Sequence, residues 1–262
     1  IKGEKMKPLR KQGIILFTIL ALIMVACGGD TAEETVEEAA PEVVETLDSP
    51  AVTTASTVKT GVGVTSDPCP EVIGGIPTGA DPSKGCIYLG LLNDYTGPFG
   101  PYGIPLETGQ RGFWLWANQS GGIGDYSVAI VEGYDTQYNP QKHLEGYKAQ
   151  RDEVAALAMS LGTPQTQFIL DDMDADNMVA APMSWYSGWS YKSSDRGLVI
   201  EFGAAYCADG MNAVDWAMAN LPVDIKTIGV MGYAGDYGGD YAAGIRVAAE
   251  ANGLEVAWEY IV

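Results

Sequence analysis

The stretch CIYLGLLNDYTGPFGPYG, residues 86–103, decides the fold of this chain. Residues 87–92 form a short apolar run that ends in turn-forming residues, which is the pattern of a strand buried in a parallel sheet. A helix is predicted over residues 107–119, because apolar residues recur there at helical spacing and Gly121 and Gly122 then end it. The stretch therefore opens a strand–loop–helix unit.

The same order of elements repeats along the rest of the chain. Further strands are predicted at residues 126–131, 155–161, 180–184, 198–202, 227–231 and 254–261, and further helices at residues 143–154, 167–179, 210–220 and 241–252. Repeated units of this kind predict an α/β fold, with parallel sheets covered by helices on both faces. Ligands of such sheets bind in the loops after the carboxyl ends of the strands. That rule selects the loops at residues 93–105, 162–166, 182–191 and 232–240.

Short motifs stand in and beside these loops. TGPFGPYG at residues 96–103 is followed by NQSGGI at 118–123, YDTQYNP at 134–140 and DYGGD at 236–240. In this order the motifs resemble those of the branched-chain amino acid (Leu/Ile/Val) substrate-binding lipoproteins of ABC transporters. The resemblance runs from about residue 87 to residue 262 and implies the type I periplasmic-binding fold.

The resemblance also implies a division of the chain. Two Rossmann-like α/β lobes with parallel sheets would close around a small solute. Residues 68–203 are expected to form lobe one, and residues 204–262 part of lobe two. Members of the family continue beyond the corresponding point, so the second lobe is expected to be truncated at residue 262.

The family's ligand contacts map onto four residues of this chain. Tyr102 matches an aromatic residue of the first loop, and Thr166 matches the hydroxyl that binds a ligand carboxylate. Ser184 lies in a loop that supplies further hydroxyl contacts, and Tyr237 matches the aromatic residue of lobe two. The resemblance implies no catalytic residue, no cofactor and no metal.

The chain departs from the family pattern in two of the loops. Pro164 removes a backbone donor from the second loop. The third loop contains four aromatic residues, which either line the pocket or pack between the lobes: Trp185, Tyr186, Trp189 and Tyr191. These departures put a branched-chain side-chain preference in doubt.

The amino terminus carries an export signal. A basic segment precedes an apolar run at residues 13–26, which is too short to span a bilayer comfortably, and Cys27 follows directly. This resembles a bacterial lipobox and implies that residues 1–26 are a signal peptide and that Cys27 carries lipid. The alternative is an uncleaved anchor. Either way the protein is expected outside the cytoplasm, anchored at the cell membrane, with residues 27–67 as a disordered acidic tether.

The charge and the cysteine and histidine content bear on possible partners, disulfides and metal sites. The formal net charge is −19, which disfavours a nucleic-acid partner. In an oxidising compartment, Cys69 and Cys86 are candidates for a disulfide, although the sequence leaves the pairing of Cys69, Cys86 and Cys207 open. Cys207 is expected to be a small buried residue. His143 is the single histidine, so neither a Cys–His catalytic pair nor a zinc site is expected.

Three functions are consistent with these features. The first is a solute-binding protein that captures a small polar solute, such as an amino acid or amide, for an ABC permease and its ATPase. The second is a ligand-sensing ectodomain of a receptor system, which neighbouring genes would distinguish from a transporter. The third is a dinucleotide-binding enzyme, suggested by GYAGDYG at residues 232–238. Its spacing differs from GxGxxG, so no enzyme activity is expected.

Overall fold

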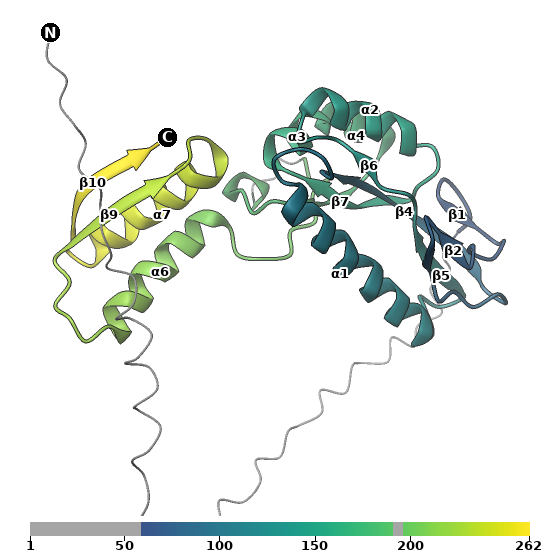
Figure 1. The fold of residues 1–262 in the computed structure, drawn as a ribbon, viewed down its shortest axis with the longest axis horizontal. Helices are drawn as coiled ribbons and strands as arrows, with labels where there is room; N and C mark the ends of the chain where they lie inside the picture. Colours follow the sequence, from purple (N-terminus) through teal and green to yellow (C-terminus); the bar gives the residue numbers. More distant parts are fainter. Residues whose placement is uncertain (1–58, 191–195) are drawn as a thin grey trace, which may run out of the picture. The chain divides into compact units, whose positions relative to one another are not determined.

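The computed structural model describes residues 59–190 and 196–262 (Figure 1). The predicted signal peptide, Cys27 and most of the predicted tether lie outside these residues, as does Tyr191. Within the described part of the chain, no helix has both the length and the apolar character needed to cross a membrane.

Lobe one is built on a six-stranded sheet. Its strands are β1 (Val64–Thr65), β4 (Gly85–Asn93), β5 (Tyr126–Ile130), β6 (Tyr134–Asp135), β7 (Ala156–Leu161) and β8 (Ala180–Met183). The order is β1-β4-β7-β8, and β5 and β6 also pair with β4. Every pairing is parallel except that of β1 with β4. The crossover helices are α1 (Gly100–Gln119), α2 (Pro140–Gln150), α3 (Thr163–Phe168) and α4 (Leu170–Asp176).

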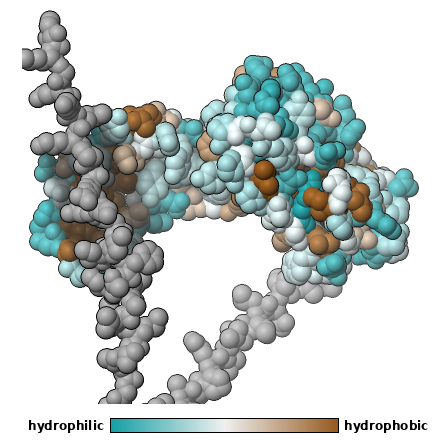
Figure 2. Space-filling view, in the orientation of Figure 1, coloured by the Kyte–Doolittle hydropathy of each residue, from teal (hydrophilic) through white to brown (hydrophobic). Residues whose placement is uncertain are grey.

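Helices cover both faces of this sheet (Figure 1). Successive residues of β4 point to opposite faces, as strand geometry requires. Leu91 packs in the core that includes Trp114 of α1, whereas Leu92 packs with Tyr147 of α2 and Met173 of α4. The outer surface over α2 is largely hydrophilic (Figure 2). The two cores explain why the strands are apolar in nearly every position, and the predicted α/β class is correct.

The second lobe contains α6 (Tyr206–Asn220), β9 (Thr227–Gly232), α7 (Asp236–Ala251) and β10 (Glu255–Ile261), and its two strands pair in parallel. Helices α6 and α7 pack closely against each other because glycines lie where their backbones meet. A side-chain carbon on Gly244 would lie 1.9 Å from the Cys207 carbonyl oxygen, and one on Gly210 would lie 2.4 Å from the Tyr241 carbonyl oxygen. Cys207 is a free thiol of intermediate exposure, so its predicted burial is wrong.

The segment before β4 is tied to the sheet. Cys69 and Cys86 form a disulfide, and both are buried beside Ala129. Between them, β2 (Val72–Ile73) and β3 (Ile76–Pro77) form a small hairpin. Lobe one includes residues before 68, where it was expected to start, because Val64 pairs with Ile87 of β4. The predicted tether is therefore too long at its carboxyl end.

Some predicted elements differ from those observed. Residues 198–202 form no strand but only a bridge between Ala180 and Val199, and the side chain of Ile200 is exposed. Helix α1 begins at Gly100 rather than at residue 107, so it contains Pro101 in its first turn, where proline is tolerated, and Pro105 in its interior. The helix predicted over residues 167–179 is two shorter helices, α3 and α4, which meet at Ile169.

Candidate functional site

The first strand-end loop is organised by the carboxylate of Asp94, which follows β4 directly. This carboxylate accepts hydrogen bonds from the backbone N–H groups of Gly97 (2.6 Å) and Phe99 (2.7 Å). A side-chain carbon on Gly97 would lie 2.6 Å from the same carboxylate, so the close approach requires glycine. The loop thereby holds the ring of Phe99 at the carboxyl end of the strand, where 39% of the residue is exposed.

A second carboxylate, that of Asp135 at the end of β6, completes this loop. It accepts hydrogen bonds from the backbone N–H of Tyr95 (2.9 Å) and from the hydroxyl of Thr96 (2.6 Å). Burial would raise the pKa of Asp135, but the hydrogen bonds from Thr96 and from nearby backbone N–H groups lower it overall. The carboxylates of Asp94 and Asp135 thus both accept hydrogen bonds that stabilise the first loop.

Tyr138 is held in an unusual backbone conformation beside this loop. Its φ is 52°, and that of Gln137 is 50°, a left-handed region that bulky residues rarely adopt. The Tyr138 ring stacks on Phe99 with 4.1 Å between ring centroids. Burial raises the pKa of Tyr138 to about 12, and electrostatic interactions with Asp236 and Tyr206 raise this pKa further. Tyr138 also packs against the same core cluster as Trp185 of the third loop.

A buried chain of hydrogen bonds stabilises the turn after β7. The hydroxyl of Thr166 donates to the Gly162 carbonyl oxygen (2.8 Å) and lies 2.7 Å from the hydroxyl of Ser160. His143 Nε2 in turn lies 2.9 Å from Ser160 Oγ. Thr166 is 0% exposed. Its hydroxyl proton is therefore directed at the Gly162 carbonyl oxygen, and the expected contact of Thr166 with a ligand carboxylate stays a prediction.

Two other polar atoms of the same turn have no partner among the described residues. They are the hydroxyl of Thr163 and the side-chain oxygen of Gln165, both in buried residues. The Gln165 amide nitrogen donates to the Tyr138 carbonyl oxygen (2.8 Å). A side-chain carbon on Gly162, where φ is 99°, would meet Gln165 Oε1 at 2.2 Å and Tyr138 Cε2 at 2.7 Å. The Gln165 oxygen and the Tyr138 ring thus lie on the same side of this glycine.

The aromatic residues of the third loop lie in two different environments, the core of lobe one and the contact with the second lobe. Trp189 is buried in the core beneath β8 and donates its indole N–H to the hydroxyl of Ser184 (2.9 Å), and Tyr186 packs against Trp189. Trp185 instead lies 6.2 Å from the ring of Tyr206 in the second lobe. Trp185 therefore packs between the lobes, as one alternative expected, whereas Trp189 and Tyr186 belong to the core of lobe one. That any of these residues lines the pocket stays a prediction.

The second lobe meets this loop through α6 and α7. Asp240 Oδ2 accepts hydrogen bonds from the backbone N–H and the hydroxyl of Ser187, each at 2.8 Å. The backbone N–H of Tyr206 donates to the Trp185 carbonyl oxygen (2.7 Å). The ring of Tyr206 makes an edge contact with that of Tyr237, with centroids 5.0 Å apart. Residues of the third and fourth loops are therefore in direct contact.

The four residues predicted from the family pattern occupy two kinds of position. Tyr102 and Tyr237 are exposed, and each belongs to an aromatic group, Tyr102 with Phe99 and Tyr237 with Tyr206. Thr166 and Ser184 are buried beneath the loops. In residues 59–190 and 196–262, no three His, Cys, Asp or Glu side chains are grouped closely enough to hold a metal ion.

Sequence reasoning missed other members of this cluster. They are Tyr138, Gln165, Tyr206 and Asp236, of which the first stands inside the quoted YDTQYNP motif. The left-handed conformation of Tyr138 leaves no compositional signal, because that region normally favours glycine or asparagine. Gln165 contacts Tyr138 and Tyr206 contacts Trp185, and both contacts join segments that lie far apart in the sequence.

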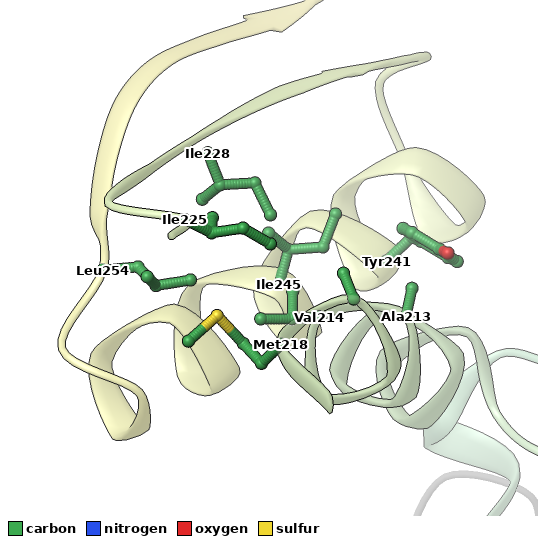
Figure 3. A pocket seen from close by; sticks show the side chains of 9 residues that line it. Ala213, Val214, Met218, Ile225, Ile228, Tyr241, Ile245 and Leu254 are labelled. Carbon is green, nitrogen blue, oxygen red and sulfur yellow. The ribbon is translucent and has the colours of Figure 1, made fainter. Parts of the chain in front are cut away.

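A separate pocket of about 130 Å³ lies inside the second lobe (Figure 3). Side chains of α6 and α7, including Val214, Met218 and Ile245, line it together with Ile228 of β9 and Leu254. The lining is almost wholly apolar and contains none of the strand-end loops. We regard it as a packing space between helices and sheet, not as the ligand site, because a specific site needs placed polar groups.

The chain belongs to the periplasmic binding protein family, because the family's sequence profile matches residues 86–262. The parallel sheets with their crossover helices are those of the type I periplasmic-binding fold. No curated protein sequence matches the chain.

Solved structures of ABC transporter proteins share this architecture. A fatty acid ABC transporter substrate-binding protein from Thermomonospora curvata is 28% identical, with a TM-score of 0.62 over 78% of this chain and 47% of that one. A branched-chain amino acid ABC transporter protein from Thermus thermophilus with bound valine is 15% identical, with a TM-score of 0.58 over 69% and 46%. A solute-binding protein from Rhodopseudomonas palustris HaA2, in complex with p-hydroxybenzoic acid, is 15% identical, with a TM-score of 0.57 over 67% and 47%. This chain therefore spans about half the length of the proteins it matches.

Proposed function

We propose that this chain is the solute-binding component of an ABC importer, working outside the cytoplasm and capturing a small solute between its strand-end loops. The observation that carries the proposal is the arrangement of four rings from separate segments: Phe99 stacks on Tyr138, Tyr138 and Trp185 pack against the same core cluster, and Trp185 contacts Tyr206 of the second lobe. Apolar walls with a few placed polar groups are typical of small-molecule sites. The arrangement offers no activated nucleophile, so we propose binding and not catalysis.

The chemical class of the solute is not decided. The candidates are the compounds named for similar proteins and those that the sequence resemblance implies. Fatty acids, valine and hydroxybenzoates are named for the solved relatives. Amino acids and amides follow from the motif resemblance. We propose that Tyr102 and Tyr237 contact the solute, since their rings are exposed at the strand-end loops. Ser184 and Thr166 are buried, and we propose that they stabilise these loops.

Isothermal titration calorimetry of the purified chain against these compounds tests the proposal. The ring of Phe99 stacks in the site, whereas Phe113, also on an exposed surface, contacts only Trp114 and Trp116 among the aromatic residues described. Phe99→Ala should weaken solute binding by about tenfold, because a stacked ring contributes about 1 kcal/mol beyond its buried area. Phe113→Ala should leave affinity within about twofold of the unchanged chain. Equal effects of both substitutions would count against this location of the site.

The membrane anchor is a separate part of the proposal. We propose that Cys27 carries lipid after removal of residues 1–26, so that the folded part is held at the outer side of the membrane beside its permease and ATPase. Metabolic labelling with a fatty acid carrying an alkyne should label the protein, and Cys27→Ser should abolish the label. Label that persists in Cys27→Ser would show that the lipid, if any, is attached elsewhere.

A further inference from the structure

We propose, resting on the function above, that Tyr138 is a positioning residue that fixes the plane of the Phe99 ring. This fixed plane makes the site select a flat, conjugated solute over a saturated solute of the same size. Phe99 would contact the solute, and Tyr138 would act through Phe99. The conformation of Tyr138, the contacts that hold it and the exposure of Phe99 support this assignment.

Gln137 and Tyr138 adopt a backbone conformation that is unfavourable for both residues. Their φ angles are 50° and 52°, in the left-handed region where a β-carbon crowds the following carbonyl oxygen. Asparagine or glycine would adopt this region at a lower cost. Residues in such conformations persist only where the surrounding structure determines them strongly, and they occur most often at functional sites. The conformation of Tyr138 therefore has to be maintained by contacts from the rest of the fold.

Contacts from the first loop, β6 and α2 hold Gln137. Its side-chain nitrogen donates a hydrogen bond to the hydroxyl of Thr96 (3.0 Å), and its side-chain oxygen accepts one from Lys142 of α2. Its backbone N–H donates to the carboxylate of Asp135 (3.2 Å). The backbone and the side chain of Gln137 are thus both held, and they determine the direction in which the chain enters Tyr138.

The second loop and the core hold Tyr138 itself. The side-chain nitrogen of Gln165 donates to the Tyr138 carbonyl oxygen (2.8 Å). Gln165 is 2% exposed, so water competes little for this hydrogen bond. The Tyr138 side chain packs against the core cluster that contains Leu91, Ile130 and Met159. The buried hydrogen bond and the core packing together restrict the position of the Tyr138 ring.

Two glycines from different loops leave room for this turn. A side-chain carbon on Gly97 would lie 2.7 Å from the carbonyl carbon of Gln137, and one on Gly162 would lie 2.7 Å from Cε2 of the Tyr138 ring. Both distances are too short for van der Waals contact between carbon atoms. The placement of the Tyr138 ring therefore depends on the absence of a side chain at each glycine, and the first and second loops both accommodate it.

The ring that is fixed in this way stacks on Phe99. The two ring centroids are 4.1 Å apart, and the ring planes differ by 30°. Phe99 is nevertheless 39% exposed, and its contact with Tyr102 is tilted, with centroids 6.3 Å apart. Tyr138 therefore supports the Phe99 ring, while more than a third of Phe99 remains exposed to a solute.

A ring that is held in one plane distinguishes solutes by their shape. A flat conjugated group can stack on Phe99 or meet it edge to face, and aromatic pairs of either kind gain energy beyond the area that they bury. A saturated ring of the same size buries a similar area without this gain. A Phe99 ring that had to be ordered on binding would offset part of the gain through its lost side-chain entropy. The fixed plane therefore favours a flat solute.

Two pairs of probes test this inference by calorimetry of the purified chain. Benzamide is compared with cyclohexanecarboxamide, and benzoate with cyclohexanecarboxylate, so that the members of each pair share their charge and polar group and differ in flatness. In each pair that binds, the flat member should bind at least about threefold more tightly than the saturated member. The saturated members are at least as apolar as the flat ones, so hydrophobicity alone predicts the opposite order.

Variants of Tyr138 separate positioning from packing. Tyr138→Leu keeps an apolar side chain but removes the ring, so it should reduce the preference for the flat probe to within about twofold. Tyr138→Phe should restore the preference, because it restores the stacked ring. Tyr260→Leu makes the same exchange at an exposed residue of β10 and should leave the preference of the unchanged chain. If Tyr138 only packed in the core, Tyr138→Leu would weaken both members of a pair equally, and their ratio would not change.

The results distinguish this inference from the proposed function. Equal binding of flat and saturated probes by the unchanged chain, or an unchanged ratio in Tyr138→Leu, would overturn the inference. If Tyr138→Leu does not fold, Gln165→Met takes its place: it removes the hydrogen bond to the Tyr138 carbonyl oxygen and should also lower the ratio, and an unchanged ratio would again overturn the inference. Binding of valine or a fatty acid but of none of the four probes would overturn the inference and leave the proposed function standing. The absence of all binding would overturn both.

Discussion

Lowering the pH from 7 to 5 should destabilise the folded chain through one side chain, His143. The imidazole is 0% exposed, and burial lowers its pKa to about 3. The hydrogen-bond chain from Thr166 through Ser160 places the imidazole proton on Nε2. Nδ1 has no partner, so its protonation would bury both a charge and an unpaired donor.

The magnitude follows from proton linkage. In the unfolded chain the histidine pKa is about 6.5, so between pH 6.5 and pH 3 the unfolded state binds more protons than the folded state. The free energy of unfolding therefore falls as the pH falls through this window, by about 2 kcal/mol between pH 7 and pH 5. For a domain of this size, that lowers the melting temperature by about 4–8 °C.

Urea denaturation at pH 7, 6 and 5 measures the effect, with His143→Gln as the variant that does not titrate. Because the chain has a single histidine, the difference in unfolding free energy between the unchanged chain and His143→Gln should change by about 2 kcal/mol across this range. Carboxylates contribute equally to both proteins and cancel. A difference that stays constant with pH would refute the reasoning, since it would mean that the folded state accepts the proton on His143 freely.

Three further predictions concern the loops and their supports. Reducing the Cys69–Cys86 disulfide should lower the free energy of unfolding by about 3 kcal/mol, because it frees a loop of 17 residues in the unfolded chain; urea titration with and without reductant measures this. Asp135→Ala should speed hydrogen exchange of the first-loop amides by at least about tenfold, because their charged acceptor is lost. Gly162→Ala should lower the free energy of unfolding by about 2 kcal/mol, because φ is 99° at this residue and neighbouring atoms occupy the space of a side chain. Gly109→Ala, in open space on α1, should raise the free energy of unfolding by about 0.5–1 kcal/mol. Thermal denaturation of the two variants compares these effects.

Much of the fold could be predicted because the strands are buried on both faces. The apolar run ending at Leu92 needs covering helices on each side, and the structure places Tyr147 on one side and Trp114 on the other. The prediction failed at residues 198–202, where an equally apolar run forms only one bridge. Apolar composition shows that a segment can join a sheet, but a strand also needs a neighbour along its whole length.

The site was predictable as a set of loops but not as a set of contacts. The rule for parallel sheets selected four strand-end loops, and Tyr102 and Tyr237 are exposed in two of them. Thr166 was assigned a ligand contact from its motif position, whereas its hydroxyl supports the Gly162 turn. Sequence spacing locates a residue near a strand end, but it does not say whether the hydroxyl points outward or inward.

By itself, the sequence determined the α/β class, the parallel sheets and the loops from which a ligand site must be built, since these follow from periodicity and from the geometry of strands. Only the tertiary structure decided which polar groups remain free. Asp94, Asp135 and Asp240 all accept hydrogen bonds from nearby donors, while Asp236 and the oxygen of Gln165 have no such donor among the residues that the structure describes. That distinction depends on hydrogen bonds between segments far apart in the chain, and composition and spacing do not encode those distances.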